Sequence, residues 1–70
     1  MNVRELKAQM IRHDKSADQL CEACGISRTS WFRKVSGVTE FTQNEISILR
    51  RELELDADQT MLIFFDGEVS

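Results

Sequence analysis

The sequence lacks proline and contains only 3 glycines among its 70 residues. Because these two residues most often interrupt helices, their scarcity favours helices joined by tight turns. Long apolar runs are also absent. The longest, Met61 to Phe65, is far shorter than the roughly 20 residues that cross a bilayer. Charged residues among the first seven positions leave no apolar centre for a signal peptide, so we expect a cytoplasmic protein.

Groups for covalent or metal chemistry are also few, with 2 cysteines and one histidine. Cys21, Cys24 and His13 could form part of a zinc site, but a closed site needs a fourth ligand. A redox pair usually stands at a helix start, whereas these cysteines fall in the middle and at the end of a predicted helix. We therefore favour reduced thiols that pack beside Leu20, with the metal and redox interpretations as alternatives. No catalytic set and no glycine-rich phosphate loop is evident, so we predict neither an enzyme nor a cofactor.

A chain of this length allows one domain, and its net charge is −3. The charge is unevenly distributed. Residues 1–37 carry seven basic and four acidic side chains, net +3, whereas residues 38–70 carry two basic and eight acidic ones, net −6. The first half could face phosphates that the second half repels, although two ordinary solvated surfaces would give the same totals.

Capping residues mark the starts of four helices, because the first N–H groups of a helix need acceptors. Capping boxes begin at Ser16, Thr42 and Asp56, and Ser27 stands where a simple cap belongs. An earlier helix, about residues 2–13, has apolar side chains at helical spacing. These signals predict an all-α domain of five helices.

The second helix, about residues 17–24, ends at Gly25, where a positive φ costs a glycine nothing. Ser27 then caps a third helix, from Arg28 to about Ser36. Two short helices joined by a turn of about three residues that contains glycine form a helix-turn-helix unit. We therefore predict this unit at residues 17–36.

The third helix has two chemically different sides. At helical spacing Trp31 falls on the core side, although a wedge between DNA bases is an alternative. Thr29 and Arg33 fall on the outward side, and no acidic residue occurs between Ile26 and Thr39. Arginine can donate two parallel hydrogen bonds to guanine, and threonine can contact several base edges. The outward side is therefore suited to the major groove of DNA.

Residues 17–37 resemble the helix-turn-helix of the Cro and phage-repressor family, also called the xenobiotic-response-element family. Residues 26–37, ISRTSWFRKVSG, are close to the pattern ISRSTLYRKING of small phage-type members. EFTQNEISILRRELELD, residues 40–56, is similar to the family's fourth helix, and IFFDGEVS, residues 63–70, to the ending of short phage regulators. The chain departs from the family at three positions: Ala17, Cys21 and Val38.

The resemblance implies a λ-repressor-like DNA-binding domain over residues 1–65, with a C-terminal tail at 66–70. It implies a transcriptional repressor of phage or mobile-element type that binds a palindromic operator in double-stranded DNA. The residues implied to contact bases are Arg28, Thr29, Phe32 and Arg33. Those implied to contact phosphates are Ser27, Lys34, Gln19 and Lys15.

The C-terminal half carries apolar residues in excess of what one core face needs, which usually indicates an interface. We predict a homodimer through Ile48, Leu55, Phe64 and Phe65. The alternative is that the last helix folds back and covers Ile48 within one chain. A rival functional interpretation is a protein-interaction module that keeps the scaffold without DNA binding, which the acidic second half, Ala17 and Val38 favour.

Overall fold

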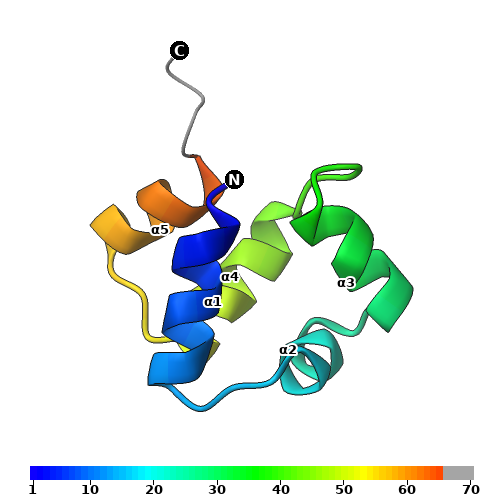
Figure 1. Cartoon of the computed structure of the whole chain (residues 1–70), viewed down its shortest axis with the longest axis horizontal. Coiled ribbons are helices and arrows are strands. Elements are labelled where there is room, and N and C mark those ends of the chain that lie inside the picture. The colour runs from blue at the N-terminus through cyan, green and yellow to red at the C-terminus, as the bar shows by residue number, and fades with distance from the viewer. Residues whose placement is uncertain (66–70) are drawn as a thin grey trace.

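The computed structural model describes residues 1–65, which form five α-helices and no strand (Figure 1). The helices are α1 (Val3–Arg12), α2 (Ala17–Cys24), α3 (Arg28–Val35), α4 (Gln43–Glu52) and α5 (Ala57–Phe64). The prediction of five helices is confirmed for these residues. None of the five is long and apolar enough to span a membrane. The predicted tail, residues 66–70, lies outside the described residues.

The helices begin where the capping residues predicted. At the start of α2, the backbone N–H of Ser16 donates to Gln19 Oε1 at 2.8 Å, and the Gln19 N–H donates to Ser16 Oγ at 3.2 Å. The same reciprocal pair forms between Thr42 and Glu45 at α4 and between Asp56 and Gln59 at α5. All three predicted capping boxes are confirmed, so local sequence alone determines these helix starts.

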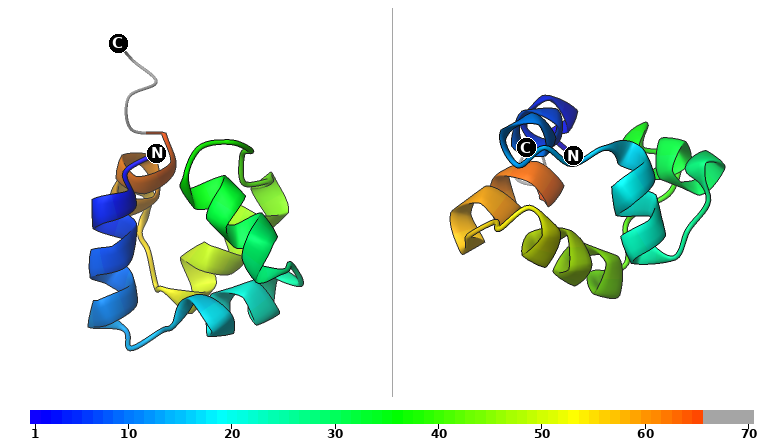
Figure 2. Two further views of the ribbon diagram at one scale, coloured as in Figure 1. Left: turned by 45° about the vertical axis from the view of Figure 1, so that its right-hand side comes forward. Right: turned by 90° about the horizontal axis from the view of Figure 1, so that it is seen from below.

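The helices form two pairs with α4 between them. α1 packs against α5, and α2 packs against both α3 and α4. Figure 2 shows α1 and α5 on one side and α2 and α3 on the other. In Figure 1 α3 and α5 lie at opposite ends of the long axis, so the outer sides of these two helices face different directions.

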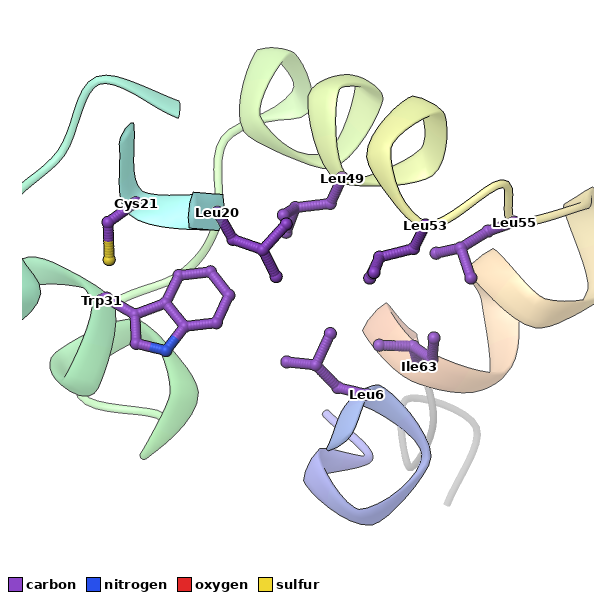
Figure 3. Packing of buried hydrophobic residues seen from close by; sticks show 8 residues of the cluster. All are labelled: Leu6, Leu20, Cys21, Trp31, Leu49, Leu53, Leu55 and Ile63. Atoms are coloured by element: carbon purple, nitrogen blue, oxygen red, sulfur yellow. The ribbon is translucent and has the colours of Figure 1, made fainter. Parts of the chain in front are cut away.

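Eight buried residues make the core, and each helix contributes at least one of them (Figure 3). They are Leu6, Leu20, Cys21, Trp31, Leu49, Leu53, Leu55 and Ile63. Trp31 is 3% exposed, so the prediction that it belongs to the core is confirmed and the base-wedge alternative is wrong. Leu55 is 6% exposed, because the connection between α4 and α5 turns it inward. Its predicted place in a dimer interface is therefore wrong.

Three aromatic rings connect α3 to α5. Phe41, just before α4, packs edge-on against Trp31 and against Phe64, with ring centroids 5.6 Å apart in both pairs. Edge-to-face pairs stabilise beyond the area that they bury. Phe64 is half-buried and packs against the core, and its predicted contact with a second copy stays a prediction.

Gly25 ends α2 with φ of 71° and ψ of 32°, as its place in the sequence predicted. A Cβ at this position would meet no atom within 4 Å, so only the backbone conformation opposes another residue. We expect Gly25→Ala to lower the free energy of unfolding by about 1–2 kcal/mol. Urea titration followed by circular dichroism measures this loss. Gly25→Asn is the control, because asparagine adopts this conformation more readily than alanine and should cost less. Equal losses for the two variants would contradict the explanation.

Candidate nucleic-acid interface

The turn between α2 and α3 is short and held by backbone and side-chain hydrogen bonds. The N–H of Ile26 donates to the carbonyl of Cys21 at 3.0 Å, which returns the chain toward α2 directly after Gly25. Ser27 then caps α3, with its Oγ accepting from the N–H of Ser30 at 3.1 Å. Because residues 25–27 are fixed at both ends, the orientation of α3 on α2 is fixed as well.

α3 presents one side to the core and one to solvent. Trp31 is buried and Val35 is half-buried against the core, as predicted. The side chains left exposed are Arg28, Thr29, Phe32, Arg33 and Ser36. All four residues predicted to contact bases are therefore accessible and lie on one short helix. Arg33 forms no ion pair within residues 1–65.

Arg28 differs from Arg33 because it is held in place. Its Nη1 donates to Oδ1 of Asp18, in the first turn of α2, and its guanidinium carbon lies 5.2 Å from the centre of the Phe32 ring. Asp18 was not among the predicted site residues. The signal that could have identified it is opposite charge in the first turns of two helices joined by a tight turn.

Lys34 lies on the inner edge of α3 and has partners inside the chain. Its Nζ is 3.0 Å from Glu45 Oε1 and donates to the Glu40 carbonyl at 3.1 Å, and its side chain is 13% exposed. A phosphate would have to compete with these partners for a cation that has little contact with solvent. The prediction that Lys34 contacts phosphate is therefore corrected: Lys34 ties α3 to α4.

Glu45 receives several hydrogen bonds in the same cluster. Burial alone would raise the pKa of Glu45, but hydrogen bonds from the Thr42 backbone and the Lys34 ammonium outweigh it and lower that pKa below its ordinary value of 4.5. A depressed folded-state pKa gives stability that is fully present above pH 4.5 and is lost as the pH falls through the folded-state value. The cluster therefore stabilises the α3–α4 contact at neutral pH and not in acid.

We expect Glu45→Gln to lower the free energy of unfolding at pH 7 by about 1–2 kcal/mol, because the Lys34 ammonium loses a charged acceptor. The amide oxygen can still complete the capping box, so the fold should persist. Below pH 4.5 the difference from the wild type should shrink. Urea titrations at pH 7 and pH 3 measure both effects, with Glu22→Gln, an exposed carboxylate of α2, as the charge control. A difference that is as large in acid would contradict the assignment.

Lys15 and Gln19, also predicted to contact phosphate, differ in the partners that their side chains have within the chain. Lys15 Nζ is 3.4 Å from Glu52 Oε1, and the neighbouring His13 Nδ1 is 3.4 Å from Glu54 Oε2, so both join the end of α1 to the end of α4. The Lys15 side chain is 32% exposed, so this ion pair leaves it accessible and its contact with phosphate stays a prediction. Gln19 is exposed and uses its Oε1 in the cap, which leaves its amide nitrogen as a donor.

The two cysteines are free thiols that contact the core. Burial raises the pKa of the Cys21 thiol, and it raises the pKa of the Cys24 thiol to about 11, with the nearby Glu45 adding to the effect. Both thiols are therefore protonated at neutral pH, and a thiol must ionise to bind metal or attack a disulfide. Among residues 1–65, no three His, Cys, Asp or Glu side chains are placed to hold a metal ion together.

Comparison with known proteins found no matching family model, curated protein or solved structure.

Proposed function

We propose that this chain is a λ-repressor-like domain in which α2 and α3 form a helix-turn-helix that binds double-stranded DNA. The proposed role is that of a transcriptional repressor of phage or mobile-element type. The observation that supports it best is the outer side of α3, where two arginines, a threonine and a phenylalanine are exposed on one short helix. These side chains have no part in the core, and they are the types that read base edges in a major groove.

In this proposal α3 lies in the major groove. Arg28 and Arg33 donate to guanine O6 and N7, Thr29 bonds to a base edge, and Phe32 contacts a thymine methyl. The N-terminus of α3 at Ser27 and the amide of Gln19 face the phosphates, because free backbone N–H groups and the helix dipole favour anions there. Lys15 is accessible and remains a proposed phosphate contact. Lys34 is not one, since its nearly buried ammonium is held by Glu45 and by the Glu40 carbonyl.

We also propose that the protein binds DNA as a two-fold dimer through α5. Met61, Leu62 and Phe65 are 58%, 42% and 42% exposed, and their spacing puts them on one side of that helix. Ile48 of α4 is half-buried. An exposed apolar side away from α3 leaves the proposed DNA-binding side free, and the two α3 helices would lie about 34 Å apart.

The dimer predicts a concentration-dependent mass in sedimentation equilibrium. We expect Met61→Glu/Leu62→Glu to shift the protein to monomer, because charged side chains are unfavourable in the centre of an interface. The fold should persist, since both side chains are exposed in the monomer. A wild-type protein that stays monomeric at high micromolar concentration would contradict the dimer.

A second candidate function is a protein-interaction module on the same scaffold. The exposed apolar side of α5 and the net charge of −6 over residues 38–70 favour it, because both suit a partner protein better than DNA. In that case the outer side of α3 would be free of function, and no duplex would bind selectively.

Selection of random duplex DNA by the purified protein separates the two candidates. The proposed function predicts recovery of a palindrome whose half-sites are one helical turn apart. Arg28→Ala/Arg33→Ala is the control and should recover no common sequence. Equal recovery of all sequences by the wild type at low salt, with loss at moderate salt, would indicate non-specific attraction only.

A further inference from the structure

The ion pair between Asp18 and Arg28 crosses the turn that joins α2 to α3. Both side chains are largely exposed, 72% for Asp18 and 51% for Arg28. Exposed ion pairs contribute little to stability, since solvent screens them and ordering two side chains costs entropy. The pair therefore has little value for the fold, and its effect is on where the guanidinium lies.

A second contact holds the same guanidinium from another direction. The Arg28 guanidinium carbon is 5.2 Å from the centre of the Phe32 ring, one helical turn further along α3. Arginine stacks favourably on aromatic faces, and the ring of Phe32 is otherwise 56% exposed. The carboxylate and the ring together confine a side chain that is flexible when it has no partner.

This arrangement leaves most of the guanidinium free. Arginine has five N–H donors in a planar fork, and Asp18 Oδ1 accepts from Nη1. Other donors remain for the paired hydrogen bonds that guanine O6 and N7 accept. Arg28 is thus fixed before it meets a base, which reduces the side-chain entropy lost on binding.

The Asp18 carboxylate helps Arg28 but disfavours contact with the phosphates of the DNA backbone. It is an exposed negative charge beside the proposed DNA-binding side, so it repels phosphates on every sequence equally. A group that weakens all complexes while helping one arginine reach its base lowers affinity and raises selectivity.

We propose that Asp18 is a positioning residue for Arg28, and that Arg28 and Phe32 together read a guanine and a thymine on neighbouring base pairs. This inference rests on the proposed DNA binding. Arg28 supplies the donors for guanine. The ring of Phe32, in contact with the same guanidinium, lies against the thymine methyl group. Asp18 touches neither base and acts through Arg28.

The test of Asp18 compares Asp18→Asn with the wild type on the selected duplex and on its three variants at the base pair read by Arg28. That base pair is the one whose preference Arg28→Ala abolishes. Asp18→Asn should bind random duplex several-fold more tightly and lose roughly two- to fivefold of the preference for guanine, the range that an exposed ion pair can supply. Glu22→Gln removes another exposed α2 carboxylate and should leave that preference unchanged. Circular dichroism confirms that each variant is folded.

The test of Phe32 replaces thymine by uracil in the same duplex, which removes only the methyl group. The wild type should bind the uracil duplex roughly fourfold more weakly, the value of one buried methyl group, and Phe32→Ala should bind both duplexes equally. If the wild type binds selectively but Asp18→Asn keeps the full preference for guanine, Asp18 is not a positioning residue. The proposed DNA binding would then stand without this inference. A wild-type protein that binds no duplex would overturn the proposed function and this inference together.

Discussion

Trp31→Ala is expected to cost the domain a large part of its stability and to move the urea midpoint far below that of the wild type. Trp31 is 3% exposed and packs edge-on against Phe41, which in turn packs on Phe64, so the substitution removes a link between α3 and α5. Truncating a buried tryptophan costs about 3–5 kcal/mol. A domain of this size has only about 4–10 kcal/mol of stability, so the loss takes from about a third to all of it. Urea titration followed by circular dichroism measures the result.

The neighbouring Phe32→Ala is the matched control. It removes an aromatic ring from the same helix, but Phe32 is 56% exposed and outside the core, so we expect a change within about 0.5 kcal/mol. Trp31→Phe should fall between the two, because it keeps part of the edge contact. A cooperative Trp31→Ala transition at the wild-type urea midpoint would show that the core does not depend on this residue.

Arg28→Ala/Arg33→Ala is expected to weaken binding to the selected duplex by roughly 30-fold to 10⁴-fold. Each arginine that donates two hydrogen bonds to a guanine contributes about 1–3 kcal/mol of discrimination, and the two are proposed to read separate bases. Both side chains are exposed, so the folded state should persist. Fluorescence anisotropy with a labelled duplex at fixed salt measures the loss.

Arg4→Ala/Arg12→Ala provides the same change in net charge on α1 and is the control. Both of these arginines are exposed and lie outside α2 and α3, so they should affect affinity only through the total charge. If Arg28→Ala/Arg33→Ala weakened every sequence equally, the two arginines would be phosphate contacts and the proposed base reading would be wrong.

The helix starts could be predicted from the sequence because capping is local. Ser16, Thr42 and Asp56 each bond to a residue three positions away, so the pattern contains both partners. The exposure of Thr29 and Arg33 followed from helical periodicity once Trp31 was assigned to the core. These two kinds of signal were enough for the helices and for the outer side of α3.

The residues that sequence analysis misplaced depend on partners far along the chain. Lys34, predicted to contact phosphate, pairs with Glu45 on the next helix. The pair of Lys15 with Glu52, 37 positions away, was also not predicted. Leu55 is buried because of a turn that follows α4, where Glu54 adopts φ of 51°. Glycine or asparagine usually marks this conformation in a sequence, and neither stands at this position. Helical periodicity cannot show such contacts, because they arise only when the helices pack.

Contact between the outer side of α3 and DNA is tested most directly by chemical-shift mapping by NMR. Titrating the ¹⁵N-labelled protein with the selected duplex should perturb the amides of residues 27–33 most strongly, and more than those of residues 59–62 on the proposed dimer surface of α5. The largest perturbations on α5, with α3 unaffected, would contradict the claim and favour a protein-interaction module.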